Sequence, residues 1–288
     1  EIVVETAPTG GDVVVIPHLR GEDGYFMVLL SSKAEAGTRA LVRDSEPLDL
    51  LILADTSGSM TDAQLREERL FIASLLESLG EKDRFNLLGL DVTAAWAFET
   101  SVPVTGESRE TALAFLEKRG ALGWTDLDLA FKEAVARARK GTHVVYVGDG
   151  IPTTGDADPV AFAERLKKLY GGEGTFHAVG VGSTQETIVL RAIASLGGGS
   201  LHATGGGKDA VKVASDLLAE ITTPGMRGIQ LEWKGIRVAR AYPEVLPNLP
   251  AGRQQIILGR YLPEGKDLKG TLRVTGTAEG RAVAVEAP

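Results

Sequence analysis

Apolar and polar positions follow one pattern in the middle of the chain and another at both ends. In the middle, short apolar runs alternate with segments in which apolar residues recur every three or four positions. The runs are typical of strands buried on both faces, and the wider spacing is typical of amphipathic helices. The expected strands are 50–54, 84–90, 94–98, 143–147, 175–181 and 200–203. The expected helices are 72–79, 127–138, 160–169 and 210–221.

This alternation of strands and helices predicts an α/β domain. We expect a doubly wound, Rossmann-like sheet that is mostly parallel and six-stranded, with helices on both faces. In such a sheet the ligand crevice forms outside the carboxyl ends of the strands, where the strand order reverses. Polar residues that directly follow two adjacent buried strands are therefore the first candidates for a functional site.

Both flanks instead contain short strands separated by turn residues, without a convincing helix. In the amino-terminal flank the expected strands are 2–5, 12–16, 25–30 and 38–42. In the carboxyl-terminal flank they are 228–233, 236–240, 254–261, 271–275 and 282–286. Neither flank alone has enough strands for a two-sheet core, so we predict that both pair into one β-sandwich. The predicted domains are this sandwich, from residues 1–47 plus 225–288, and an inserted α/β domain at 48–224.

Composition narrows the possible functions. The 288 residues are 43% hydrophobic, which is enough for a substantial core, and the net charge of −8 argues against nucleic-acid binding. The absence of cysteine excludes disulfides and thiolate chemistry, and no apolar stretch reaches the ~18 residues of a membrane span. The four histidines, at positions 18, 143, 177 and 202, lie in strand-like segments without ligand spacing. We interpret them as core or surface strand residues.

Five oxygen-bearing side chains lie in three separated segments. Asp55, Ser57 and Ser59 follow the strand at 50–54, and Asp149 follows the strand at 143–147. Thr125 lies between these segments, before the helix expected near residue 127. Two carboxylates and three hydroxyls, without thiol or imidazole, are the donors that suit a hard divalent cation.

Each segment also has an ordinary structural interpretation. Asp55, Ser57, Ser59 and Asp62 precede a helical pattern and would serve as helix caps, each stabilising the helix by about 1 kcal/mol. Thr125 would cap the next helix in the same way, and the Asp-Gly pair that follows 143–147 would form a common turn. The occurrence of all three segments at expected sheet ends favours the metal site over three unrelated caps and turns.

The same residues carry a resemblance to a known family. Asp55-Thr-Ser-Gly-Ser59, Thr125 and Asp149, in this order and spacing, resemble the metal-ion-dependent adhesion site of von Willebrand factor type A domains, over residues 48–223. The resemblance implies that the three hydroxyls contact the metal directly and that the two aspartates hold it directly or through water. One departure is Gly148, where the family often has Thr, and we expect little consequence because that side chain is not a ligand.

The flanks carry a weaker resemblance. The segments 24–29, 242–243 and 249–252 are similar to the surroundings of this domain in the inter-alpha-trypsin inhibitor heavy-chain group and its bacterial relatives. Those proteins have a further upstream domain, called VIT. Because the chain starts at Glu1 rather than Met, we expect a fragment of a longer protein with further domains.

Function follows from the expected site. We predict a non-enzymatic protein-binding or adhesion module, in which Mg²⁺, or else Mn²⁺ or Ca²⁺, is completed by an acidic residue of a partner protein. Trp124 and Asp126 flank the expected ligand Thr125 and are candidates for partner contact, although Trp124 would also suit packing under its loop and Asp126 a helix start. The alternatives are an accessory subunit of a chelatase or ATPase complex and a metal-dependent hydrolase. An extracellular or cell-surface location is expected, and a periplasmic or cytoplasmic one stays open.

Overall fold

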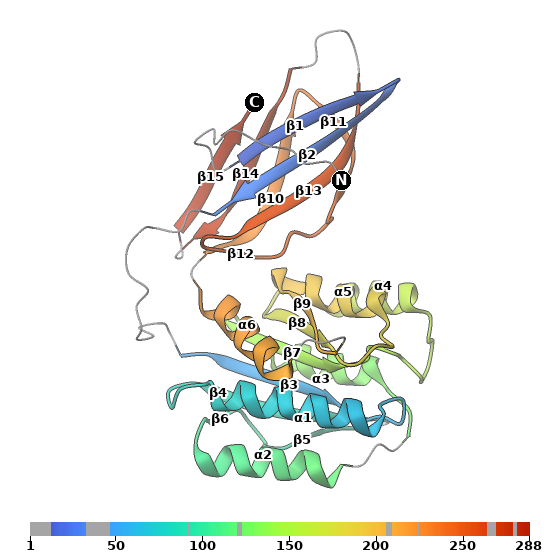
Figure 1. Cartoon of the computed structure of the whole chain (residues 1–288), viewed down its shortest axis with the longest axis vertical. Helices are drawn as coiled ribbons and strands as arrows, with labels where there is room; N and C mark the ends of the chain where they lie inside the picture. The colour runs from blue at the N-terminus through green and yellow to red at the C-terminus, as the bar shows by residue number, and fades with distance from the viewer. Residues whose placement is uncertain are drawn as a thin grey trace. The chain divides into compact units, whose positions relative to one another are not determined.

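The computed structural model describes residues 13–32, 47–91, 93–119, 123–205, 209–223, 225–263, 269–278 and 281–288. These residues form two compact units (Figure 1). One unit combines the described residues up to 32 with those from 223 onward, and the other comprises those from 47 to 222. The strands expected at 2–5 and 38–42 lie outside the described residues. Within the described part of the chain, no helix has the length and apolar character needed to cross a membrane.

The second unit contains the expected mostly parallel sheet. Among the described residues it has seven strands, six of them in the continuous order β5-β4-β3-β7-β8-β9, while β6 pairs with β4 outside this path. Only β5 and β6 run antiparallel to their neighbour β4. The strands are β3 (Asp49–Asp55), β4 (Arg84–Leu90), β5 (Ala94–Trp96), β6 (Val102–Pro103), β7 (Thr142–Gly148), β8 (Thr175–Gly180) and β9 (Leu201–Ala203). The doubly wound fold class is thereby confirmed, but the expected count of six strands was too low, because the two-residue strand β6 is too short to give a hydrophobic pattern.

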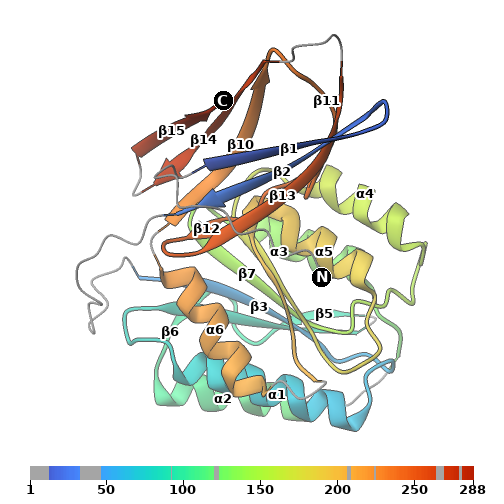
Figure 2. The same cartoon turned by 45° about the horizontal axis from the view of Figure 1, so that its top comes forward.

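Helices cover both faces of this sheet (Figures 1 and 2). One face packs against α1 (Asp62–Glu77), α2 (Gly106–Lys118) and α6 (Ala210–Thr222). The other face packs against α3 (Leu127–Arg137), α4 (Pro159–Leu169) and α5 (Thr187–Ser195), which leads into a short 3-10 turn at Leu196–Gly198. Fully buried Leu and Phe side chains dominate both cores, and burying each one stabilises the fold by about 1.5–3 kcal/mol.

Two of these helices were not among those expected from the sequence. Helix α2 buries only Ala112 and Leu116 completely, so its apolar stripe is too narrow to produce a clear helical period. Helix α5 is nine residues long and largely apolar, and a short apolar run of this kind does not distinguish a helix from a buried strand.

The first unit is a β-sandwich formed by both flanks, as predicted. One antiparallel sheet has the order β1-β2-β13-β11 and the other β12-β10-β14-β15. Strand β2 pairs with β13, so residues from opposite ends of the chain share a sheet, and Val28, Ile257 and Leu272 pack in one core between the two sheets. The strands are β1 (Val13–Arg20), β2 (Asp23–Ser31), β10 (Gly225–Lys234), β11 (Arg237–Tyr242), β12 (Leu249–Pro250), β13 (Gln254–Leu262), β14 (Thr271–Ala278) and β15 (Arg281–Ala287).

The topology of the α/β unit determines where a site can form. The chain passes from β3 to β4 on one side and later returns to β7 on the other side, so the strand order reverses between β3 and β7. These two strands are hydrogen-bonded neighbours, with Ala54 opposite Val147. Asp55, the last residue of β3, and Asp149, which directly follows β7, therefore lie at the same edge of the sheet.

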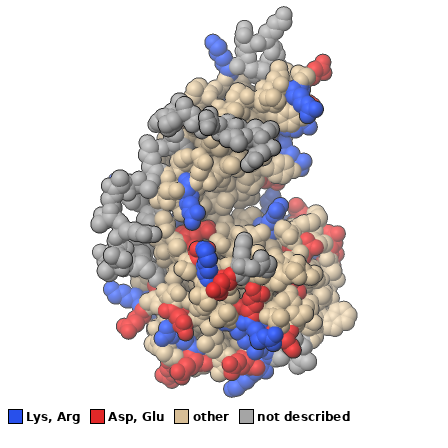
Figure 3. Space-filling view, in the orientation of Figure 1, with Lys and Arg blue, Asp and Glu red and all other residues tan. Residues whose placement is uncertain are grey.

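Charged side chains of both signs are interspersed on one face of the molecule (Figure 3). On the face drawn in Figure 3, Lys and Arg side chains alternate with Asp and Glu over the α/β unit. The visible part of the β-sandwich is mostly uncharged. Among the described residues visible on this face, no continuous basic stripe of the kind that tracks a nucleic-acid backbone is seen.

Candidate metal site

The first loop of the site begins at Asp55, the last residue of β3, which is completely buried. Its amide donates a hydrogen bond to Oε1 of Glu68 on α1, at 2.8 Å. Its carboxylate accepts from the amide of Ser57 at 3.1 Å and from the hydroxyl of Tyr146 at 2.8 Å. Both oxygens of Asp55 are therefore oriented by the protein itself.

The two serines of this loop lie side by side. The Oγ atoms of Ser57 and Ser59 are 2.9 Å apart. Between them, the amide of Gly58 donates to the carbonyl of Gly123 at 2.9 Å, which joins the first loop to the second. A Cβ on Gly58 would lie 2.8 Å from that carbonyl oxygen, so only glycine allows this close approach of the two backbones.

The second loop carries Thr125, whose side chain is completely buried. Its amide donates to Oγ1 of Thr153 at 2.6 Å, and its carbonyl accepts from the amides of Thr153 and Thr154 at 3.3 and 3.2 Å. The Oγ1 atom of Thr125 itself has no hydrogen-bond partner among the described residues. A buried polar atom without a partner costs about 1–3 kcal/mol and calls for an explanation, such as an ion that it would bind.

The third loop follows β7. The carboxylate of Asp149 accepts from the amide of Ile151 at 2.9 Å, and Gly150 has a positive φ of 73°. The amide of Gly150 donates to the hydroxyl of Tyr146 at 3.1 Å, and the same hydroxyl donates to Asp55. Hydrogen bonds thus join the first loop to the second and the second to the third, and the Tyr146 hydroxyl links the first to the third.

Burial of two acids at one place raises their pKa values. Burial, and then the charge of Asp149, raise the pKa of Asp55 from 3.8 to about 7, although hydrogen bonds from Ser57 and Tyr146 partly oppose this shift. Burial also raises the pKa of Asp149, against the lowering effect of the Ile151 amide and the Ser59 hydroxyl. Two such acids ionise together readily only when a cation is present between or beside them.

The alternative roles as helix caps do not describe these residues. Helix α1 is capped by Thr61, which forms a reciprocal capping box with Gln64, so none of the acids and serines of the first loop caps it. Helix α3 is capped by Asp126, whose side chain accepts from the amide of Leu129 at 2.9 Å. Thr125 is therefore not the cap of α3, and its hydroxyl does not bond to the first turn of that helix.

The donors fit a hard divalent cation. Nowhere in the described ranges do three His, Cys, Asp or Glu side chains group in a way that would hold a metal ion. The candidate site instead combines two carboxylates with three hydroxyls, a set of oxygen donors suited to Mg²⁺, Mn²⁺ or Ca²⁺ rather than to a thiolate-binding metal. The unpartnered hydroxyl and the two buried acids supply what such an ion needs.

Two further residues beside the site were not identified from the sequence. Glu68 is buried on α1, and burial together with the charge of Asp55 raises its pKa well above 4.5. The sequence could have revealed it, because a Glu lies in the apolar stripe formed by Leu65 and Ile72, where a charged residue is unusual. Tyr146 had only a weak signal, a hydroxyl within a buried valine-rich strand. Its ring also explains Gly148, because a Cβ there would lie 2.5 Å from the Tyr146 hydroxyl and 2.5 Å from Cβ of Asp55.

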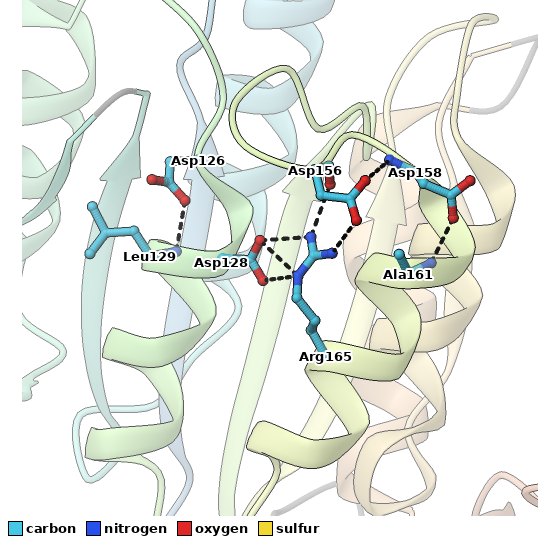
Figure 4. Close-up of polar contacts among 7 residues, drawn as sticks. All are labelled: Asp126, Asp128, Leu129, Asp156, Asp158, Ala161 and Arg165. Atoms are coloured by element: carbon cyan, nitrogen blue, oxygen red, sulfur yellow. Dashed lines mark hydrogen bonds and ion pairs between the residues drawn. The ribbon is translucent and has the colours of Figure 1, made fainter.

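The rim of the site includes one exposed aromatic residue. Trp124 is 65% exposed, so its side chain does not pack under its own loop. Asp126 lies beside it as the cap of α3. Farther along the rim, Arg165 on α4 donates to both oxygens of Asp128 on α3 and pairs with Asp156 in the loop after β7 (Figure 4). These partly exposed ion pairs join the start of α3, the middle of α4 and the loop after β7. Each contributes at most about 1 kcal/mol.

Comparisons with known proteins agree with this architecture. A family model described as von Willebrand factor type A domain matches residues 48–203, more than half of the chain. Inter-alpha-trypsin inhibitor heavy chain H4 of Sus scrofa is 23% identical over 276 residues, which cover 92% of this chain and 28% of that protein. The chain thus spans less than a third of the length of that relative.

Solved structures extend the likeness to the whole chain. A von Willebrand factor type A structure from Catenulispora acidiphila has a TM-score of 0.66 at 15% identity, with 96% of this chain and 72% of that chain covered. The ArnB paralog VWA2 from Sulfolobus acidocaldarius has a TM-score of 0.58 at 14% identity, with 96% and 74% covered. At these identities the likeness shows a shared fold.

Proposed function

The chain belongs to the von Willebrand factor type A family, and on that premise we propose that it is a non-enzymatic, metal-dependent protein-binding or adhesion module. A divalent cation, Mg²⁺ in the first place, binds at the carboxyl edge of the sheet, and an acidic residue of a partner protein completes its coordination. The residues that would hold the cation are Asp55, Ser57, Ser59, Thr125 and Asp149.

One observation carries this proposal. The hydroxyl of Thr125 is buried without a partner among the described residues, in a loop joined to those of two buried acids whose pKa values are raised. A bound cation would give this hydroxyl a partner and would compensate the charge of both acids. If the same residues served only as turns, the hydroxyl would still lack a partner and the charge of the two acids would not be compensated.

The donor set explains why a partner is expected. Five side chains leave at least one of the six coordination positions of Mg²⁺ open, and acids that act in part through water attract the ion less strongly than direct ligands. A carboxylate from another protein supplies a hard oxygen donor and a negative charge together. The chemistry that the cation adds is therefore attraction of an anionic oxygen, with the protein's side chains holding the ion in place.

Trp124 is the side chain proposed to contact the partner beside the metal. Exposed Trp residues often act as anchors in protein interfaces, since they bury a large area with few rotatable bonds. Asp126 was predicted as a second contact. Its carboxylate also caps α3, so we propose that it reaches a partner only through the oxygen that does not accept from Leu129. An extracellular or cell-surface location is part of the same proposal.

Selection from a phage-displayed peptide library tests this function. The immobilised protein is exposed to the library in Mg²⁺, and bound phage are eluted with EDTA. Peptides recovered by the chelator are expected to contain Asp or Glu and not to bind a Thr125→Val variant. Trp124→Ala is expected to weaken the capture of these peptides while it leaves Mg²⁺ binding unchanged. Recovery of peptides that lack an acid, or that EDTA does not release, would contradict the proposal.

A further inference from the structure

A single buried hydroxyl lies between two loops of the metal site. The hydroxyl of Tyr146 donates to Oδ2 of Asp55 at 2.8 Å and accepts from the amide of Gly150 at 3.1 Å. Asp55 ends β3, whereas Gly150 follows Asp149 in the loop after β7. The hydroxyl thus connects one candidate acidic ligand to the backbone next to the other.

The ring of Tyr146 holds this hydroxyl in place. Tyr146 is completely buried, and its ring packs against Phe131 on α3 with the ring centroids 5.9 Å apart. A close-packed interior allows such a ring few alternative positions. The oxygen at its tip is therefore a fixed point, and both loops are positioned against it.

Gly148 provides the space for this arrangement. Any Cβ at this position would lie 2.5 Å from the Tyr146 hydroxyl, 2.9 Å from its Cζ atom and 2.5 Å from Cβ of Asp55. Real Cβ atoms do not approach other atoms so closely, so a side chain here would push the hydroxyl away from Asp55. The glycine at 148 and the tyrosine at 146 form one structural unit.

We infer that Tyr146 is a positioning residue for the cation site, and that its hydroxyl sets the orientation of Asp55 relative to the Asp149 loop. This inference rests on the proposed metal-binding function and adds a residue that does not itself contact the cation. Groups that orient metal ligands typically account for about 10–100-fold in metal affinity.

Calorimetric titration of Mg²⁺ into chelator-treated wild type, Tyr146→Phe and Tyr170→Phe tests the inference. Tyr170 is the matched control, because its hydroxyl also donates one hydrogen bond, to the carbonyl of Gly174 at 2.9 Å, in the same unit. We expect Mg²⁺ to bind Tyr146→Phe about 10–100-fold more weakly than wild type and to bind Tyr170→Phe equally well. Gly148→Ala, which displaces the hydroxyl sterically, is expected to weaken Mg²⁺ binding in the same direction.

Hydrogen exchange of the metal-free proteins gives a second readout that does not depend on the cation. Peptides that contain Gly150 are expected to exchange faster in Tyr146→Phe than in wild type, because this amide loses its acceptor. Equal Mg²⁺ affinity of Tyr146→Phe and wild type would overturn the inference and leave the proposed function intact. Equal weakening in Tyr146→Phe and Tyr170→Phe would also overturn it, as a general loss of stability. Absence of Mg²⁺ binding in wild type would overturn both the inference and the proposed function.

Discussion

Replacement of Thr125 by Val is expected to stabilise the metal-free protein while it abolishes the metal site. The substitution exchanges the buried hydroxyl for a methyl group and leaves the backbone hydrogen bonds of Thr125 to the Thr153 loop in place. A buried polar atom without a partner costs about 1–3 kcal/mol, so the metal-free variant gains about that amount in the free energy of unfolding. For a domain of this size, each kcal/mol raises Tm by about 2–4 °C.

Saturating Mg²⁺ offsets this difference in stability, because it stabilises wild type. At about 100 times the dissociation constant, a bound ligand stabilises the folded protein by about 2.7 kcal/mol. Wild type is expected to gain this stabilisation, whereas the variant, which lacks one of the proposed ligands, is expected to gain little of it. Thermal unfolding followed by circular dichroism, in EDTA and in Mg²⁺, measures both effects. We expect the variant to have a higher Tm than wild type in EDTA and almost no change of Tm with Mg²⁺.

Thr142→Val is the matched control. The hydroxyl of Thr142 is also buried, but it donates to Oδ2 of Asp49 at 3.0 Å and accepts from the amide of Arg139 at 3.1 Å, at the opposite end of β7. This variant is expected to lose stability in both conditions and to keep the full Mg²⁺ shift. The reasoning is refuted if Thr125→Val destabilises the metal-free protein as Thr142→Val does, or if it keeps the Mg²⁺ shift of wild type.

Three further predictions concern the same site. The folded protein keeps the Asp55 proton between about pH 4 and 7, where the unfolded chain releases it, so metal-free stability falls as pH rises through this window. Because Mg²⁺ must displace that proton, calorimetry should show about 10-fold weaker Mg²⁺ binding at pH 6 than at pH 8. A pH-independent affinity would contradict the raised pKa of Asp55. Glu68→Gln keeps an acceptor for the Asp55 amide and should change the free energy of unfolding, measured in urea, by less than about 1 kcal/mol. Glu68→Leu removes the acceptor and should lower the free energy of unfolding by about 1–3 kcal/mol. Equal effects of the two variants would exclude this hydrogen bond as the role of Glu68. Gly58→Ala brings a Cβ within 2.8 Å of the Gly123 carbonyl and should weaken Mg²⁺ binding without loss of helical circular dichroism; unchanged affinity would show that this contact is not needed.

Much of the fold was predictable because the hydrophobic pattern is strong where burial is complete. The apolar runs before Asp55 and Asp149 correspond to β3 and β7, whose interior positions are completely buried. Both flanks showed short strands without a helix, too few in either flank for a two-sheet core, which indicated that both belong to one β-sandwich. The pairing of β2 with β13 confirms it. Elements that bury few residues, such as α2, gave no such pattern.

The supporting contacts of the site could not be predicted in the same way. The hydrogen bonds of Tyr146 to Asp55 and Gly150 join residues from different elements, and they depend on how a ring packs in the finished core. No local spacing encodes such a contact. Position 148 was expected to matter little because it is not a ligand, whereas the structure shows that its lack of a side chain makes room for Tyr146.

The contacts among the histidines likewise could not be predicted from the sequence. Individually they are strand residues, as interpreted from the sequence, and His143 and His177 are buried. In the folded unit, however, the ring nitrogens of His143 and His177 are 3.1 Å apart, and Ser200 lies 3.0 Å from His177 and 3.2 Å from His202. His202 in turn lies 3.1 Å from Glu220 on α6. This polar chain crosses three strands and a helix, so only the tertiary structure reveals it.

Crystals of the protein grown with Mn²⁺ offer the most direct test of the central claim, that these five oxygen-bearing residues form a cation site. The anomalous scattering of manganese locates the ion independently of any assumption about its ligands. We predict one strong anomalous peak within coordination distance of the Oγ1 atom of Thr125 and the Oγ atoms of Ser57 and Ser59, and its absence in crystals of Thr125→Val. A peak elsewhere in the α/β unit, or none at saturating Mn²⁺, would contradict the claim.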